Sequence, residues 1–313
     1  MGSIDQLEQL EVNGSRQWVH CRSEDQTKPV VLFVHGGPGS PLMLFSRAFD
    51  QHFIRDFVVV HWDQRGSGKS YNPKESIATF SIEQVAQDGL AVVNYLKQKF
   101  QKDRVLLVGH SWGSMVGSEM VNKRPEDFQA YISVGTVADM KKGDLLKFAF
   151  LGQQIAVSGN ATHGKELTQM GPPPWVHFSQ LVYLSRLMTI YKGSFYSLSP
   201  DEIERAIEKT AEYTAKEIES LNKAMEQIWH KIFPFLCNYR AIDHFRELKV
   251  KTYFAQGDFD MATPTSLARD YFSQLLCPAG KEWVSFAKSS HFPMYEEPKS
   301  FLDLLRRASA IES

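Results

Sequence analysis

A pentapeptide in the first half of the chain limits the possible folds more than any other segment. It reads Gly-His-Ser-Trp-Gly at residues 109–113, follows the apolar run Val105–Val108 and precedes a stretch compatible with a helix. Small residues two positions before and two positions after Ser111 allow a strand and a helix to approach closely. The turn between them is sharp, so the Ser111 hydroxyl stands clear of the sheet above the amino-terminal end of the helix. The pattern therefore predicts a strand–turn–helix unit with an accessible serine.

Two segments of the chain, roughly residues 8–135 and 248–313, alternate short apolar strands with helical patterns. Continuous apolar strands with helices between them predict a parallel sheet that is covered on both faces. The expected strands are Gln17–Cys21, Val30–Val34, Phe57–Trp62, Val105–Val108, Ala130–Val134, Val250–Ala255 and Trp283–Ala287, and the expected helices include Ile82–Phe100 and Pro298–Ala308.

The segment between these two parts has a different pattern. It contains no convincing strand, and helical runs such as Asp201–Phe233 dominate it, with a proline-rich loop at Gly171–Trp175. The run from Asp201 follows Ser-Pro, which is a typical helix start. The sequence thus predicts one α/β domain in two parts, 1–136 and 246–313, with an all-helical cap inserted at 137–245.

Composition narrows the class of partner and the compartment. The net charge is −1 with acids and bases interspersed, and this disfavours nucleic acid and anionic membranes as partners. No apolar run approaches the length of a membrane span, and the polar amino terminus has no secretory pattern. Gln6 stands where a myristoylation motif after Gly2 needs Ser or Thr. Because the three cysteines, Cys21, Cys237 and Cys277, form no disulfide or metal spacing, we expect a soluble cytoplasmic protein without a metal site.

Loops at the carboxyl ends of the predicted strands carry the candidate chemistry, because ligands bind at that edge of open α/β sheets. The Ser111 hydroxyl is a weak nucleophile at neutral pH and needs an adjacent base. Among ten histidines, His291 is the candidate base because it follows the last predicted strand. An orienting acid is expected after the strand that ends near Ala255, and both Asp258 and Asp260 lie there. For either acid, a helix-cap or loop hydrogen bond is the structural alternative.

Two further loops follow apolar strands. His-Gly-Gly-Pro-Gly at residues 35–39 lets backbone approach a ligand, and we assign the N–H groups of Gly37 and Trp112 to an oxyanion hole. Residues 63–70 superficially resemble a phosphate loop but lack its glycine spacing. We expect Asp63 and Arg65 to order the loops around the site rather than to act in catalysis.

Taken together, these loops resemble the α/β-hydrolase superfamily and, within it, the proline iminopeptidase group of serine peptidases. The resemblance is carried by His-Gly-Gly-Pro-Gly (35–39), Asp-Gln-Arg-Gly-Ser-Gly-Lys-Ser (63–70), Gly-His-Ser-Trp-Gly (109–113), Gly257-x-x-Asp260 with Pro264, and His291-Phe292. It covers about two thirds of the chain, at both ends. In that family the Asp at the position of Asp260 is catalytic, so the resemblance favours Asp260 over Asp258.

The resemblance fades in the predicted helical insertion. In iminopeptidases, cap glutamates hold the free amino terminus of the substrate, and Glu226 is similar in placement to one of them. No second glutamate matches, and a solvated helix face is the alternative for Glu226. Trp175 and Trp229 are candidates for an apolar substrate wall, with core packing as the alternative.

The resemblance and the loops imply a serine hydrolase that needs no cofactor and works through an acyl-enzyme. The expected substrate is a small peptide from which an N-terminal residue is released, as in proline iminopeptidases. An ester, lactone or amide of a small metabolite is the alternative within the enzyme class. A non-hydrolytic protein that keeps the pocket as a ligand-binding site is the alternative in another class. The sequence does not predict an oligomeric state.

Overall fold

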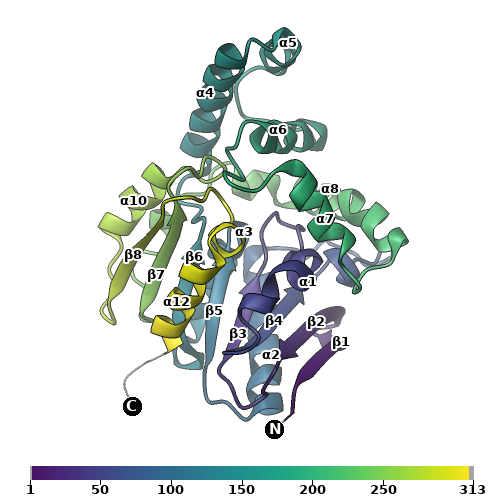
Figure 1. Ribbon diagram of the computed structural model, residues 1–313, viewed down its shortest axis with the longest axis vertical. Helices are drawn as coiled ribbons and strands as arrows, with labels where there is room; N and C mark the ends of the chain where they lie inside the picture. Colours follow the sequence, from purple (N-terminus) through teal and green to yellow (C-terminus); the bar gives the residue numbers. More distant parts are fainter. Residues whose placement is uncertain (1, 310–313) are drawn as a thin grey trace.

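The computed structural model describes residues 2–309, and an eight-stranded sheet forms its centre (Figure 1). The strand order is β1-β2-β4-β3-β5-β6-β7-β8; β2 is antiparallel to both β1 and β4, and the other neighbouring pairs are parallel. The strands are β1 (Ile4–Val12), β2 (Ser15–Ser23), β3 (Val30–Val34), β4 (Val58–Asp63), β5 (Val105–His110), β6 (Phe128–Val134), β7 (Thr252–Gly257) and β8 (Lys281–Phe286).

Helices cover the sheet and fill the connection between β6 and β7. They are α1 (Ser46–Phe49), α2 (Ile82–Phe100), α3 (Trp112–Lys123), α4 (Met140–Ser158), α5 (Ala161–Met170), α6 (Phe178–Ile190), α7 (Pro200–Glu208), α8 (Ala215–Leu236), α9 (Ala241–His244), α10 (Thr265–Gln274), α11 (Pro293–Glu296) and α12 (Pro298–Ser309). Side chains of α2 and α3 pack on one face of the sheet, and those of α12 pack on the other. The α/β fold class predicted from the sequence is confirmed.

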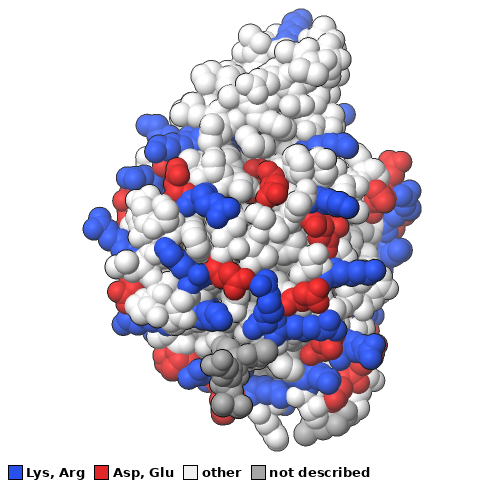
Figure 2. All heavy atoms as spheres, turned by 60° about the vertical axis from the view of Figure 1, so that its left-hand side comes forward, with Lys and Arg blue, Asp and Glu red and all other residues white. Residues whose placement is uncertain are grey.

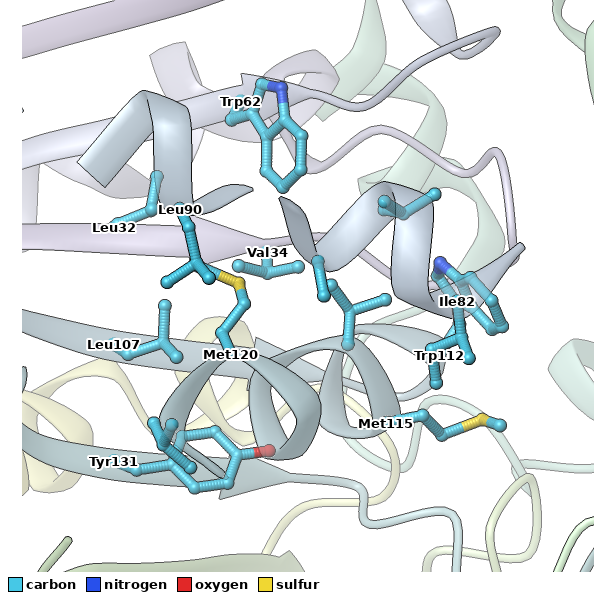
Figure 3. Close-up of a cluster of buried hydrophobic side chains, with 14 of the residues drawn as sticks. Leu32, Val34, Trp62, Ile82, Leu90, Leu107, Trp112, Met115, Met120 and Tyr131 are labelled. Atoms are coloured by element: carbon cyan, nitrogen blue, oxygen red, sulfur yellow. The ribbon is translucent and has the colours of Figure 1, made fainter. Parts of the chain in front are cut away.

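The central strands are apolar on both faces because both faces are covered. In β3, Leu32 and Val34 belong to the core beneath α2 and α3, whereas Val31 and Phe33 face the core beneath α12. The first core also holds Trp62 and Trp112, the latter at the start of α3 (Figure 3). Burying a large apolar side chain contributes roughly 1.5–3 kcal/mol. The residue that follows Ser111 is therefore anchored in the main core.

Two elements differ from the sequence-based expectation. Strand β1 was not expected, because its residues Ile4–Val12 are mostly polar and partly exposed at the sheet edge. The predicted helical run Asp201–Phe233 is two helices, α7 and α8, with a break at residues 209–214. The prediction of one run was wrong because Glu212 and Tyr213, within the break, are buried against the sheet domain.

The chain between β6 and β7, all of it within the described part, forms helices α4 to α9 and no strand. We call residues 137–245 the helical insertion. The predicted domain boundaries at 136 and 246 stay a prediction, and the last four residues of the second predicted core segment lie outside the described residues.

Helices α4, α5 and α6 project from the rest of the molecule (Figure 1). Charges of both signs are interspersed over the body, whereas the projecting part presents few charged side chains on the face in Figure 2. Within residues 2–309, no helix combines the length and apolarity needed to cross a membrane.

Candidate active site

Ser111 lies at the junction of β5 and α3 in a strained backbone conformation. Its φ of 55° and ψ of −120° lie outside the regions that non-glycine residues normally adopt. The Ser111 N–H donates to the Val134 carbonyl oxygen at 2.9 Å, which fixes the turn against β6. A Cβ atom on Gly113 would lie 2.0 Å from the Val34 oxygen, so only glycine fits there. The sharp strand-to-helix turn expected from the sequence is present.

His291 and Asp260 form a buried pair at the carboxyl edge of the sheet. His291 Nδ1 lies 2.8 Å from Asp260 Oδ2, and Asp260 is only 1% exposed. The Thr263 N–H and hydroxyl each donate to the Asp260 carboxylate at 2.9 Å. Asp258 is exposed. Since a carboxylate on Nδ1 leaves Nε2 free to accept a proton, the pair has the geometry of a base and its orienting acid.

The loop that carries His291 is held from two sides. His110 Nε2 lies 2.9 Å from the His291 carbonyl oxygen, and burial lowers the His110 pKa well below its usual value. The neutral ring therefore donates its single proton to that carbonyl. On the other side, the His291 N–H donates to the Ser194 carbonyl oxygen at 3.0 Å. His110 therefore positions the loop that carries the base and is not itself a second base.

Gln64 connects the two loops that were expected to form the oxyanion hole. Its side-chain amide donates to the His35 carbonyl oxygen at 2.9 Å, and its amide oxygen accepts the Trp112 indole N–H at 2.9 Å. Its backbone N–H donates to His35 Nε2 at 3.2 Å, and burial lowers the His35 pKa to about 4. A neutral His35 is needed for this contact. The sequence signal for Gln64 was present, since it lies in the Asp-Gln-Arg-Gly segment.

A cavity of about 330 Å³ lies between these loops and the helical insertion. Ser111, His291, Gly37 and Trp112 all line it. The walls contributed by the insertion are mainly apolar and include Met140, Leu181, Leu184, Met188, Phe195, Trp229 and Leu236. This volume is near the lower end of the roughly 300–1,000 Å³ found for small-molecule sites.

The three insertion residues expected to bind substrate have different positions. Trp229 lines the cavity. Glu226 does not line it; its side chain is 53% exposed and lies 3.8 Å from His230. Trp175 is buried against Phe148 in the projecting part, also outside the cavity. The structure thus places Glu226 on an exposed helix face and Trp175 in core packing, and it does not bring either residue to the cavity; a role in substrate binding stays a prediction for both.

Two carboxylates that sequence reasoning missed line the cavity instead. Asp139 caps α4 by accepting the Lys142 N–H at 3.0 Å, and it lies 3.6 Å from Arg240. Asp144, one turn into α4, accepts from Lys147 at 3.1 Å. The available signal was their place just after β6, at the edge of the sheet where ligands bind.

Asp63 and Arg65 have structural contacts, as expected, and neither lines the cavity. Arg65 donates two hydrogen bonds to Asp88, at 2.8 and 3.0 Å. Asp63 accepts from the Tyr213 hydroxyl at 2.6 Å and from the Lys69 N–H at 2.7 Å. Burial raises the Asp63 pKa to about 7 in spite of these donors.

Asp5, His20 and Glu212 are the acid–histidine group within residues 2–309 whose ligand atoms lie close enough to hold a metal ion. The Arg47 guanidinium bonds to both carboxylates, and Arg22 lies 3.6 Å from Asp5. Arginine neutralises the charge that a cation would need, so we assign the group to an ion-pair network that joins β1, β2 and the α7–α8 connection.

A strained serine that lines the same cavity as a buried histidine–aspartate pair, at the carboxyl edge of a mostly parallel sheet, is typical of α/β hydrolases. The family model described as "alpha/beta hydrolase fold" matches residues 29–298, and the chain belongs to this family.

The chain is also similar to named relatives over most of its length. The chain is 28% identical over 308 residues to the "Probable aminopeptidase YbaC" of Bacillus subtilis (strain 168), covering 97% of this chain and 96% of the relative. It is 24% identical over 297 residues to a "Proline iminopeptidase" of Lactobacillus delbrueckii subsp. bulgaricus, covering 91% and 92%. The crystal structure of the proline iminopeptidase of Mycobacterium smegmatis has the same fold, with a TM-score of 0.67, 15% identity and coverage of 96% and 97%.

Proposed function

We propose that the protein is a serine hydrolase of the aminopeptidase type, which releases an N-terminal residue from small peptides through an acyl-enzyme. The names of the relatives support the aminopeptidase class. Asp144 supports it from the site, because its carboxylate lines the same cavity as Ser111 and His291. Lys147 lines the cavity as well and its ammonium group bonds to this carboxylate, so the ammonium group of a substrate is a chemically equivalent partner for Asp144.

Each residue of the site has a role in this proposal. Ser111 Oγ attacks the carbonyl carbon of the first peptide bond, and His291 Nε2 takes the hydroxyl proton. Asp260 stabilises the imidazolium that forms. The Gly37 and Trp112 N–H groups stabilise the negative charge that develops on the carbonyl oxygen. His291 then gives its proton to the leaving amine, and a water molecule that His291 deprotonates releases the N-terminal residue from Ser111.

Asp144 is the proposed partner of the substrate's ammonium group. Asp139 is already engaged as the cap of α4, whereas Asp144 is bound by the Lys147 side chain alone among the hydrogen bonds of the described residues. Substrate binding exchanges the Lys147 contact for the ammonium group of the substrate. Because both partners are charged, this exchange conserves the number of charge-assisted hydrogen bonds.

The amine requirement is tested with matched substrates. We expect prolyl and other aminoacyl arylamides to be hydrolysed, and the same compounds with an acetylated amino group to be inert. Asp144→Asn should lower kcat/KM for free amines by about 10–100-fold, because a bond to a charged group contributes about 1.5–3 kcal/mol. Glu226→Gln is the matched control and should change little. Equal rates on free and blocked substrates would contradict the aminopeptidase proposal and favour a general esterase or amidase.

The nucleophile is tested separately by labelling with a fluorophosphonate probe. Wild-type protein should label, and Ser111→Ala should not. Ser114→Ala, three residues along α3, is the control for a nearby serine. Labelling of Ser111→Ala at the wild-type level would remove Ser111 from the mechanism, and a wild-type protein that does not label would favour a non-hydrolytic binding protein.

A further inference from the structure

A second cavity of about 560 Å³ lies next to the one that holds Ser111. We call the two the inner and the outer cavity. Three residues line both of them: Thr189 at the end of α6, Phe195 in the connection to α7, and Ile203 in α7. The two spaces are therefore separated by one layer of side chains, and the outer cavity is the more open to solvent.

One face of α7 forms most of the outer cavity. Pro200, Ile203, Glu204, Ile207 and Glu208 line it, and their spacing of three and four residues places them on one stripe of the helix. Thr210 and Ile218 complete the opposite side. Among the described residues that line this cavity, the two glutamates are the charged ones, and both are exposed. The outer cavity thus has an apolar floor and an acidic rim.

The shared wall is connected to the catalytic base. The Phe195 ring stacks on the ring of Phe292, with centroids 4.4 Å apart and planes at 2°. Phe292 directly follows His291, whose N–H donates to the carbonyl oxygen of Ser194. Since His291 must reach the leaving amine, the side of the inner cavity next to Phe195 is the side on which the leaving group departs.

We propose that the outer cavity is the subsite for the leaving portion of the substrate, the peptide segment that follows the scissile bond. This inference rests on the proposed aminopeptidase function. The inner cavity is too small for more than a short substrate, and a longer one extends past the half-buried side chain of Ile203, which lines both cavities.

The walls of the outer cavity define the chemistry of this segment. The isoleucines and Phe195 fit an apolar side chain directly after the scissile bond. Glu204 and Glu208 at the rim favour a cationic group at the next position. The same glutamates disfavour an anionic group there, which includes the free carboxylate of a very short peptide.

The first experiment fills the outer cavity. Three substrates share an N-terminal proline: prolyl-glycinamide, a prolyl-isoleucyl-lysine amide and a prolyl-isoleucyl-glutamate α-amide. Ile207 lines the outer cavity and not the inner one. Ile207→Trp should lower kcat/KM for the lysine peptide by about 10-fold or more and leave prolyl-glycinamide unchanged. Val157→Trp, on an exposed position of α4 that lines neither cavity, is the control.

The second experiment removes the rim charge without changing its shape. Wild-type enzyme should have a higher kcat/KM for the lysine peptide than for the glutamate peptide. In the double variant Glu204→Gln with Glu208→Gln, the ratio of these two kcat/KM values should fall by about 2–5-fold, as expected for exposed ion pairs. Glu219→Gln, on an exposed position of α8 outside the cavity, should keep it. The preference should also fall as salt concentration rises.

The outcomes separate this inference from the proposed function. If wild-type enzyme cleaves none of the three prolyl amides and no other aminoacyl amide, the aminopeptidase function fails and the subsite fails with it. If prolyl-glycinamide is cleaved but Ile207→Trp leaves kcat/KM nearly unchanged for all three substrates, the subsite is overturned and the aminopeptidase function stands. If Ile207→Trp does not fold, as judged by loss of prolyl-glycinamide cleavage, the glutamine variant decides, and an unchanged preference overturns the subsite.

Discussion

At the scale of single residues, the environment of each carboxylate determines what it can do. Asp260 and Asp258 are two positions apart, yet Asp260 is buried on His291 and Asp258 is exposed. Asp63 is buried as well, but its contacts are with Tyr213 and Lys69. Sequence position alone left the choice between Asp258 and Asp260 open, because the direction of a side chain in a loop depends on contacts from distant parts of the chain.

The two acids near His291 give a direct prediction. Asp260→Asn should lower kcat by about 10⁴-fold, because an amide cannot hold the imidazole in the required tautomer or stabilise its charged form. Asp258→Asn should change kcat by less than about 2-fold, as expected for an exposed side chain without a catalytic contact. Steady-state kinetics on one arylamide substrate measure both. The opposite order of effects would make Asp258 the orienting acid.

The raised pKa of Asp63 predicts a pH dependence of stability. With a pKa of about 7 in the folded state and 3.8 as the reference, the folded protein holds a proton between these values that the unfolded chain loses. The loss of this proton on unfolding therefore lowers the free energy of unfolding as pH rises from about 4 to 7, by up to about 1.4 kcal/mol per pH unit. The substitution Asp63→Asn removes this contribution of Asp63 to the pH dependence of stability.

Urea unfolding at several pH values checks this expectation. The stability of Asp63→Asn relative to wild type should increase as pH rises from about 4 to 7 and then level off. The control Asp258→Asn changes an exposed carboxyl and should give a flat difference over the same range. A difference for Asp63→Asn that stays constant or falls would show that Asp63 is ionised throughout.

At the scale of helices and strands, the turn between β5 and α3 depends on glycine. A Cβ atom at Gly113 would meet backbone at 2.0 Å, which no side-chain rotation can relieve. Gly113→Ala should cost roughly 1–3 kcal/mol or more of stability. Gly152, inside α4, has nothing within 4 Å of its added Cβ, so Gly152→Ala should be neutral or stabilising by up to about 1 kcal/mol. Equal effects of the two variants in thermal unfolding would contradict the close approach.

Elements with one strong signal were predictable from the sequence, and others were not. Strand β3 and helix α2 begin and end where the sequence predicts, because an uninterrupted apolar run and a regular helical spacing define them. Strand β1 has polar residues on both faces and resembles a loop. The start of α8 could have been found, since Thr214 and Glu217 form a capping box. The break before α8 is set by contacts with the sheet domain, which local sequence does not reveal.

Some residues of the candidate site were likewise predictable from the sequence, and others were not. Ser111, His291 and Gly37 follow apolar strands, and the order of strands along the chain predicts that such loops meet. The walls from the insertion were not predictable, because a helix carries acids and aromatic residues all around its surface. Which of them face the cavity depends on how the helix packs, and Asp144 rather than Glu226 is on the inner side.

At the scale of the whole molecule, polar contacts fasten the α7–α8 region to the sheet domain, and each of the following three contains a hydrogen bond between side chains. Tyr213 bonds to Asp63, Lys69 bonds to Glu217 at 2.8 Å, and Arg47 bonds to Glu212 at 2.6 Å. The Tyr213 contact is the one that is buried on both sides. Breaking this contact is therefore costly, because it leaves a buried acceptor with one donor fewer.

Removing one hydroxyl tests this connection. Tyr213→Phe should cost about 1–3 kcal/mol, because it leaves the buried Asp63 carboxyl with one donor fewer. Tyr183→Phe removes a similar hydroxyl that bonds to exposed Glu166 at 2.5 Å, and it should cost less than about 1 kcal/mol. Chemical unfolding of both variants gives the comparison. A larger loss for Tyr183→Phe would mean that the insertion is not fastened to the sheet domain through Asp63.

The stacking of Phe195 on Phe292 limits how a substrate can enter. Together with the bond from the His291 N–H to Ser194, it connects this stretch of the insertion directly to the loop that carries the base. If the insertion swung away from this side, it would carry His291 away from Ser111. The enzyme could then not take up substrate by this movement and transfer a proton through His291 at the same time. A substrate that enters past α7 or between α4 and α6 leaves His291 in its position. Those two routes are therefore compatible with rapid turnover.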